Sequence, residues 1–388
     1  MARIILLTDL SEEYAKLLLK GIVSYSEEQG AWSVCKMPLS YRAVNGVEGV
    51  LEWALKWKAD AIIAQFNPTD DVAVFARNGI IAIAQDYKER FKEIANITGN
   101  HVEAGKMGAA YFIERGFKNF AFYGYKGFVW SEERFEGFRT ELEKAGFRER
   151  IYEYQNTELT ELWFYDSEPL SAWLNALPKP IALMASDDNQ AHHIIELCNQ
   201  NGIQIPEDIA VLGVDNDETI CALSMPPLSS INQAVEQGGY EAARMIDRLL
   251  HNPDMKPYDV VVYPTHIITR DSTDIYATSH IYIQKVLKYI HQNVEDKLTV
   301  TDIVKLVPMS RRLLEIKFRE ITGKSIYAYI LSLRIEKFAQ QLVDTDRPIL
   351  DIAMEQGLSD YKNISRQFKK MKEYTPLEYR KKFSRNNK

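Results

Sequence analysis

Cysteine is scarce in this sequence: the 388 residues include three, Cys35, Cys198 and Cys221, which lie far apart in the chain. This spacing provides neither a disulfide framework nor a cysteine metal cluster, so we expect no bound metal and a reducing, cytoplasmic environment. Long hydrophobic runs are also missing, because none approaches the roughly 18 residues that a membrane-spanning helix requires. Residues 1–9 lack the cleavage pattern of a signal peptide and are typical of a first strand. We therefore expect neither membrane contact nor export.

The pattern of a catalytic site is missing too. No nucleophile, base and orienting residue stand out together, so we expect no catalytic residue and no cofactor. Gly323-Lys324-Ser325 resembles the end of a phosphate-binding loop, but Phe318 stands where that loop needs its first glycine. His192 and His193 would point apart on a helix, so they cannot bind one metal ion together. An enzyme is therefore not the favoured interpretation.

Charge is distributed unevenly along the chain. The net charge is −7, yet residues 281–388 hold 22 Lys and Arg against 13 Asp and Glu, which is +9. Residues 1–280 hold 25 against 41, which is −16. The chain is also too long for one ordinary core. A basic domain on an acidic body indicates a protein that contacts a polyanion such as DNA with one end.

Residues 1–270 alternate short apolar runs with amphipathic segments. The expected strands are 4–9, 61–65, 80–86, 120–125, 182–187, 210–215 and 260–263. The expected helices between them are 12–28, 102–115, 134–145, 190–201 and 233–250. Continuous apolar strands separated by helices are typical of parallel sheets covered by helices on both faces. At this length we expect two such sheets, facing each other across a cleft.

Several of these strands end in acidic residues, namely Asp9, Asp86, Asp187, Asp188 and Asp215. In open α/β sheets, ligands bind outside the carboxyl ends of the strands. Aspartate is also a common helix N-cap, so each of these residues has that structural alternative. So many carboxylates favour a ligand rich in hydroxyl groups, held by charge-assisted hydrogen bonds. Phe66 and Trp130 are candidates to stack on its apolar face, although either ring could instead belong to the core.

Two stretches near the C-terminus, 298–318 and 349–370, repeat one pattern: an apolar first helix, a tight turn, and a second helix with exposed basic and polar side chains. This pattern is typical of helix-turn-helix DNA-binding units. A long helix expected over 326–344 would fix their separation. Residues 271–280 are polar and aperiodic, and we expect them to link residues 1–270 to an all-α domain, residues 281–388.

The second helix of each unit supplies the outward-facing residues. Ser310 is a good N-cap, and Leu314 and Phe318 lie on the buried stripe. The candidates for DNA contact are Arg311, Arg312, Glu315, Tyr361, Lys362, Ser365, Arg366, Lys369 and Lys370. Arginine can read guanine through two hydrogen bonds, whereas lysines near helix ends mostly contact phosphates. Surface solubility is the alternative role for each of them, above all for the lysines.

Residues 283–384 resemble the AraC-type DNA-binding domain. The motifs are Ile352-Ala353, Gly357-Leu358, Ser365-Arg366-Gln367-Phe368-Lys369-Lys370 and Thr375-Pro376-Leu377-Glu378-Tyr379-Arg380. The chain departs from the family pattern at Glu373, where glycine is usual, at Phe338, where alanine is usual, and at Ile316, where a basic residue is frequent. Two recognition helices on one rigid body should enter successive major grooves.

Residues 1–270 resemble the effector domain of LacI-type regulators and periplasmic sugar-binding proteins. The motifs are Arg115-Gly116-Phe117, Arg134-Phe135-Glu136-Gly137-Phe138, Asp187-Asp188-Asn189-Gln190-Ala191 and Ile205-Pro206-Glu207-Asp208. The resemblance implies that Arg134, Asp188 and Asp215 contact the effector. LacI-type proteins carry their DNA-binding unit before the first strand, whereas here it follows the α/β domain. This order of parts resembles the activators of xylose operons.

These patterns predict a two-lobed α/β domain with parallel sheets, followed by an all-α domain with two helix-turn-helix motifs. We expect a homodimeric transcription activator of sugar-utilisation genes, for a pentose such as xylose. Its expected partners are a double-stranded DNA operator and a small neutral sugar, and contact with RNA polymerase is compatible with this role. The alternatives are a regulator that senses a non-sugar ligand or acts without one, and a sugar-processing enzyme with an appended DNA-binding unit.

Overall fold

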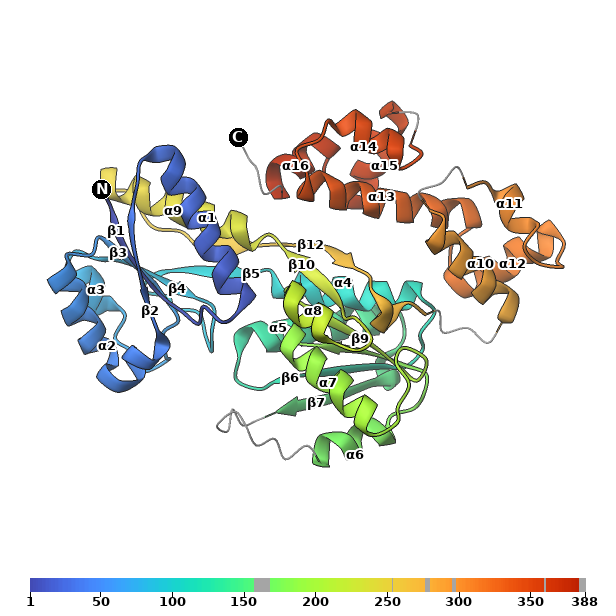
Figure 1. Cartoon of the computed structure of the whole chain (residues 1–388), viewed down its shortest axis with the longest axis horizontal. Coiled ribbons are helices and arrows are strands. Elements are labelled where there is room, and N and C mark those ends of the chain that lie inside the picture. Colours follow the sequence, from blue (N-terminus) through green and yellow to red (C-terminus); the bar gives the residue numbers. More distant parts are fainter. Residues whose placement is uncertain (157–167, 253, 276–279, 295–297, 359–360, 384–388) are drawn as a thin grey trace.

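The fold was obtained as a computed structural model that describes residues 1–156, 168–252, 254–275, 280–294, 298–358 and 361–383. Within these residues the chain forms two α/β lobes and a helical C-terminal domain (Figure 1). Among the described residues, no helix is both long and apolar enough to cross a membrane.

The first lobe is built on a parallel sheet with the strand order β11-β5-β4-β3-β1-β2. Its strands are β1 (Arg3–Leu7), β2 (Ser33–Met37), β3 (Ala61–Ala64), β4 (Ile81–Gln85), β5 (Ala95–Gly99) and β11 (Val260–Val262). Its helices are α1 (Glu13–Gln29), α2 (Leu39–Trp57), α3 (Ala73–Arg77) and α9 (Val235–His251). Helices α1 and α9 cover one apolar face, and α2 and α3 cover the other. Burial on both faces explains why these strands are continuously apolar.

The second lobe has the strand order β12-β10-β9-β8-β6-β7, with all pairs parallel except β10 and β12. Its strands are β6 (Phe120–Tyr125), β7 (Ile151–Asn156), β8 (Ile181–Ala185), β9 (Ile209–Val214), β10 (Ser229–Gln233) and β12 (Pro264–Ile268). Its helical segments are α4 (His101–Glu114), α5 (Val129–Lys144), α6 (Glu168–Ala176), α7 (Asp188–Gln200), α8 (Glu218–Leu223) and the 3-10 turns η1 (Arg148–Arg150) and η2 (Asp271–Thr273). Helices α4 and α5 approach closely because glycine lies at their contact: a Cβ atom on Gly105 would lie 2.0 Å from the carbonyl oxygen of Arg134.

The chain passes between the lobes from β5 to α4, from β10 to α9, and from β11 to β12. Backbone hydrogen bonds tie these crossings together. The amide of Asn100 donates to the carbonyl of Val262 at 2.7 Å, and the amide of Ala234 donates to the carbonyl of Tyr263 at 3.0 Å. The crossings therefore form one hinge, about which the lobes can change their relative orientation.

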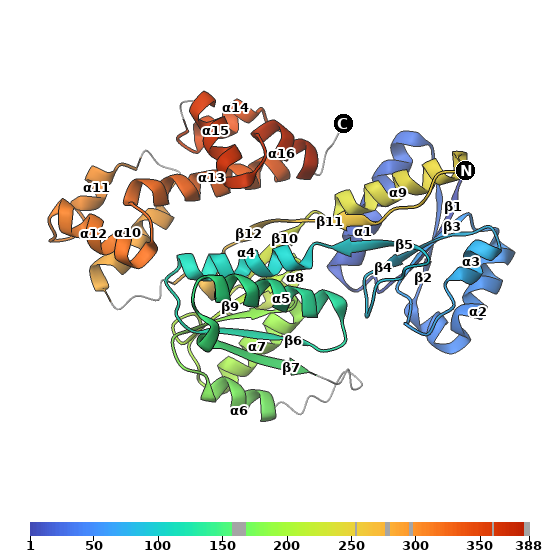
Figure 2. The same ribbon diagram turned by 180° about the vertical axis from the view of Figure 1, so that it is seen from behind.

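The C-terminal domain consists of α10 (Ile281–Gln292), α11 (Val300–Val304), α12 (Arg311–Thr322), α13 (Ile326–Asp344), α14 (Ile349–Glu355), α15 (Tyr361–Lys372) and α16 (Pro376–Phe383). It has two apolar cores, and the long helix α13 contributes to both. Seen from either side, α13 lies between the sensor lobes and helices α14 and α15, and α11 lies beyond one end of α13, beside α10 and α12 (Figures 1 and 2). The helix predicted over 326–344 is confirmed.

The predicted fold class is confirmed, with two corrections in detail. The strands β2, β5, β7, β10 and β12 were not predicted. The predicted linker, 271–280, begins too early, because Ser272 and Thr273 are fully buried in the second lobe. The hydroxyl of Ser272 donates to the carbonyl of Val211 at 2.7 Å, so η2 is part of that lobe. Residues 276–279 lie outside the described part of the chain.

Candidate functional site

Arg134 and Asp215 form the centre of a polar cluster between the lobes. Arg134 is 2% exposed, and its Nη2 donates to Oδ1 of Asp215 at 3.0 Å. The same guanidinium donates to the carbonyl of Ser186, and the side-chain amide of Gln233 donates to Asp215. Trp130, one turn earlier on α5, has its ring centre 5.4 Å from the guanidinium carbon. Three predicted residues, Arg134, Asp215 and Trp130, thus lie together in the second lobe.

The loop that carries Asp215 has a strained backbone. Asp215 has φ of 99° and Asn216 has φ of 52°, a region that residues with a side chain adopt at a cost of about 1–3 kcal/mol each. The amide of Asn216 donates to the hydroxyl of Ser230 at 3.0 Å, and Arg270 donates to the Asn216 side chain at 2.9 Å. Strain that the surroundings maintain is typical of functional sites. The strained loop fixes the direction in which the Asp215 carboxylate points.

Asp188 is hydrogen-bonded inside the second lobe, and its predicted contact with a ligand stays a prediction. It is 2% exposed, its Oδ1 accepts from Ser230 at 2.6 Å, and its Oδ2 accepts from the amide of Asp217 at 2.7 Å. Burial, with the nearby charges of Asp215 and Asp187, raises the pKa of Asp188 well above its usual range. Because its acceptors are used inside the lobe, Asp188 positions the loop that presents Asp215.

Asp187 lies closer to the interlobe cluster. Its Oδ1 accepts from the amide of Gln190 at 2.8 Å, so it also serves as the N-cap of α7. Burial and the charge of Asp215 raise the pKa of Asp187 to about 6. The helix-cap alternative is therefore what the structure shows for Asp187, and its contact with a ligand stays a prediction.

Phe66, the other aromatic candidate, lies in the core of the first lobe. It is 1% exposed and packs against Phe75 and Phe91, with ring centres 5.7 and 5.9 Å away. The core alternative therefore describes the position of Phe66, and its contact with a ligand stays a prediction.

The first lobe contributes Asp9 and Glu12, which follow β1. Asp9 accepts from the hydroxyl of Ser11 at 2.6 Å. Glu12 accepts from the side-chain amide of Asn189 at 3.2 Å, which joins the first lobe to the second. Desolvation and the carboxylates of Asp187, Asp215, Asp9 and Asp217 raise the pKa of Glu12 to about 7. The carboxylates of both lobes therefore share one electrostatic environment, and sequence analysis missed Glu12 and Asn189 within it.

Tyr14 is a further residue that sequence analysis missed. Its hydroxyl oxygen is buried and has no hydrogen-bond partner among the described residues. Burial and the carboxylates of Asp86 and Asp215 raise the pKa of Tyr14. The side-chain oxygens of Thr8 and Gln85, next to the ends of β1 and β4, also lack such a partner there. An unsatisfied buried polar group costs about 1–3 kcal/mol, which a ligand with several hydroxyl groups would recover.

A pocket of about 430 Å³ opens beside these first-lobe residues. It is lined by Thr8, Asp9, Leu10 and Ser11 after β1, and by residues 36–40, which form the end of β2 and the start of α2. The carboxyl ends of parallel strands are where α/β proteins bind ligands, so the pocket lies on the expected edge of the sheet.

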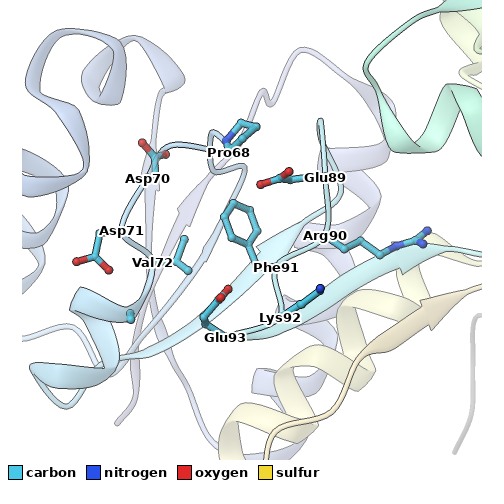
Figure 3. A pocket seen from close by; sticks show the side chains of 10 residues that line it. Pro68, Asp70, Asp71, Val72, Glu89, Arg90, Phe91, Lys92 and Glu93 are labelled. Carbon is cyan, nitrogen blue, oxygen red and sulfur yellow. The ribbon is translucent and has the colours of Figure 1, made fainter.

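Asp86, a predicted ligand-binding residue, contacts residues at the end of β5 and the start of α4, where the chain enters the hinge. Its Oδ2 accepts from Thr98 at 2.6 Å and lies 2.8 Å from Nε2 of His101. The neighbouring Arg90 forms two contacts of 2.6 Å with Glu133 of the second lobe. In Figure 3, Arg90 extends away from a surface pocket of about 400 Å³ formed by the loops after β3 and β4. Asp86 and Arg90 therefore help to fix the orientation of one lobe relative to the other.

In the C-terminal domain, α12 and α15 are the second helices of the two helix-turn-helix units. Ser310 caps α12 by accepting from the amide of Leu313 at 3.3 Å. Of the predicted DNA-contact residues, the exposed ones are Arg311, Arg312, Arg366, Lys369 and Lys370, and the partly buried ones are Glu315 and Ser365. The side chains of Tyr361 and Lys362 lie outside the described part of the chain.

A two-lobed α/β domain with a hinge and a polar interlobe cluster, joined to two helix-turn-helix units, defines a class of protein: a DNA-binding transcription regulator with its own sensor domain. Comparisons with known proteins agree. Residues 109–273 match the family model of the periplasmic binding protein-like domain, and residues 303–382 match that of a helix-turn-helix domain. The chain therefore joins a region similar to periplasmic binding protein-like domains to a region similar to helix-turn-helix domains.

Relatives with the same order of parts exist. The chain is 28% identical over 390 residues to the xylose operon regulatory protein of Escherichia coli, covering 97% of this chain and 96% of that protein. It is 26% identical over 387 residues to the protein of the same name from Haemophilus influenzae, covering 97% and 98%. A solved xylose-binding transcription activator superposes with a TM-score of 0.60 at 27% identity, covering 98% of both chains.

Proposed function

We propose that a small neutral sugar, with D-xylose as the first candidate, binds between the two lobes and controls DNA binding by the C-terminal domain. The observation that carries this proposal is the interlobe cluster. In it the Asn189–Glu12 hydrogen bond joins the lobes, Arg134 pairs with Asp215, and the buried Tyr14 hydroxyl has no hydrogen-bond partner among the described residues. The names of the relatives supply the candidate sugar.

The chemistry of the cluster suits a neutral polyol. Asp215 can accept from one hydroxyl group while Arg134 donates to its neighbour, and Trp130 can stack on the C–H face of a sugar ring. Asp9, Glu12, Asp187 and Asp215 outnumber the nearby cation Arg134, so the site disfavours anions such as sugar acids. A non-sugar ligand remains the alternative to be tested.

Sugar would act by binding one lobe orientation more tightly than another. A ligand shifts such an equilibrium only by its differential affinity. A hundredfold preference supplies about 2.7 kcal/mol. The cytoplasm is the inferred site of action, because DNA is the target, and we further infer a homodimer, contact with RNA polymerase, and binding without chemical turnover of the sugar.

Thermal unfolding with D-xylose, D-ribose, L-arabinose, D-glucose and D-xylonate tests the proposal. D-xylose is expected to raise the midpoint of the wild-type protein, and D-xylonate is not. The rise should shrink in Tyr14→Phe, because the variant lacks the hydroxyl that meets the ligand. Tyr25→Phe is the matched control, since its hydroxyl bonds Asp247 within the first lobe at 2.9 Å. A flat panel would contradict a sugar effector, and a full shift in Tyr14→Phe would remove Tyr14 from the site.

Arg366 is proposed to read a base in the major groove. Arg366→Ala is expected to weaken binding to a DNA sequence selected by the wild-type protein by about 1–3 kcal/mol, with a smaller effect on random DNA. Arg347→Ala is the control, because Arg347 is paired with Glu355 on α14, outside the recognition helices. Fluorescence anisotropy on both DNAs measures the difference. Equal losses on the two DNAs would make Arg366 a phosphate contact instead.

A further inference from the structure

The C-terminal domain rests directly on the hinge between the lobes. The crossing from β11 to β12 consists of Val262, Tyr263 and Pro264, and its carbonyl groups take part in the hydrogen bonds that join the crossings. Any change in lobe angle must alter backbone torsions at these residues. A side chain that is hydrogen-bonded to or packed on this segment therefore shifts when the lobe angle changes.

Two aromatic residues of α16 and one from the hinge make this contact. Tyr379 is 4% exposed, and its hydroxyl donates to the carbonyl of Thr265 at 2.9 Å. The ring of Tyr263 packs on the second core of the C-terminal domain, with its centre 6.1 Å from that of Phe383. Lys382 holds its ammonium group 4.4 Å from the centre of the Tyr263 ring. The hinge segment thus contributes a ring to the core that supports α14 and α15.

A second contact joins the same strand to α13. The ring of His266, on β12, is 3% exposed, and its Nε2 lies 3.9 Å from Oδ2 of Asp344 at the end of α13. Helices α13 and α16, which support the second helix-turn-helix unit, are therefore both fixed to the segment from Tyr263 to His266.

The first helix-turn-helix unit is attached differently. Lys324, just before α13, pairs with Glu114 at the end of α4 at a distance of 2.5 Å. Next to this ion pair, a cavity of about 550 Å³ lies between α4 and β12 on one side and α10, α13 and Lys372 of α15 on the other. Both units therefore border the sensor lobes. The second unit is the one whose supporting helices, α13 and α16, contact the hinge segment itself.

We propose that the segment Tyr263–His266 transmits the lobe angle to the second helix-turn-helix unit, and that Tyr379 is the positioning residue of this coupling. The proposal rests on the proposed function, in which a ligand changes the lobe angle. The interaction surface is the β11–β12 crossing, and its partner is α16 of the same chain. The contact lies beside the hinge. A change in lobe angle would therefore move α16 and, with it, α15, and it need not be transmitted along the chain through residues 276–279.

Hydrogen exchange of the full-length protein tests the coupling. In the wild-type protein, D-xylose should change the exchange of α16 amides by about fivefold, and those of α12 by less. In Tyr379→Phe, which removes the hydroxyl alone, the change in α16 should fall below about twofold, because loss of one neutral hydrogen bond reduces coupling by roughly fivefold. Tyr25→Phe should respond as the wild-type protein does. A merely structural role for Tyr379 would alter melting but leave the sugar-induced difference intact.

Two further variants keep the test independent of folding and of the sugar. Lys382→Met removes the cation beside Tyr263 and should also reduce the response of α16. Glu133→Gln breaks the interlobe ion pair with Arg90, which lies far from α16 in sequence. This variant should change the hydrogen exchange of the α16 amides even when no ligand is present. If D-xylose has no effect on melting but Glu133→Gln alters α16, the sugar assignment fails and the coupling stands. An unaltered α16 in Glu133→Gln, or an equal sugar response in Tyr379→Phe and wild type, would overturn the coupling.

Discussion

Replacing Arg134 by methionine is expected to abolish the response to sugar and to lower the free energy of unfolding by about 3 kcal/mol. Arg134 is almost fully buried and joins Asp215 to the carbonyl of Ser186. Without the guanidinium, Asp215 keeps Gln233 but loses its counter-charge while Asp187 and Glu12 remain near. The sugar also loses a charged donor, so its affinity should fall at least a hundredfold, or about 2.7 kcal/mol.

Titration calorimetry with D-xylose and urea unfolding would measure the two effects separately. Arg139→Met is the matched control, because Arg139 lies on the same helix, is exposed, and contacts the ring of Phe135. Its effect on stability should stay within about 0.5 kcal/mol, and sugar affinity should not change. Wild-type sugar affinity in Arg134→Met would show that the ligand does not meet this pair.

Asp188→Ala should lower the free energy of unfolding by about 2–4 kcal/mol, because it leaves the hydroxyl of Ser230 and the amide of Asp217 without their acceptors. Sugar binding should weaken as a consequence, since the loop that presents Asp215 loses its anchor. Asp187→Ala is the matched comparison: loss of a helix cap costs about 1 kcal/mol, while sugar affinity falls directly.

The stability effect of Asp188 should also depend on pH. Its pKa is raised in the folded protein, so folding favours the protonated carboxyl. The stabilisation is therefore fully present below the ordinary pKa, at about pH 4, and is lost as pH rises through the raised value. The difference between wild type and Asp188→Ala in urea should shrink from acidic to neutral pH. A difference that grows with pH would mean that Asp188 is held as a carboxylate.

The sequence revealed those elements whose apolar residues follow a regular period. The strands β1, β3, β4, β6, β8 and β9 are apolar runs, and α13 has continuous helical spacing. The strand β10 gave no such signal, because its sequence is Ser-Ser-Ile-Asn-Gln. All five of its residues are buried, and its polar side chains form hydrogen bonds with partners distant in sequence, such as Asp188 for Ser230. A periodicity argument cannot anticipate partners of this kind.

The resemblance to known families also identified a departure that the backbone explains. Glu373 stands where the AraC-type pattern has glycine, and it adopts φ of 65°, a conformation that glycine enters without steric cost. The chain therefore keeps the backbone turn between α15 and α16 while accepting local strain from the side chain.

The sequence by itself determined the order of the domains, the two helix-turn-helix units and the acidic residues at the strand ends, since periodicity, charge and strand-end chemistry are local properties of the chain. Only the tertiary structure decided the direction in which each carboxylate points. It turned Asp188 inward to Ser230, left Asp215 beside Arg134, and joined Glu12 of the first lobe to Asn189 of the second. It also placed Tyr379 on the hinge, because that contact joins residues more than a hundred positions apart.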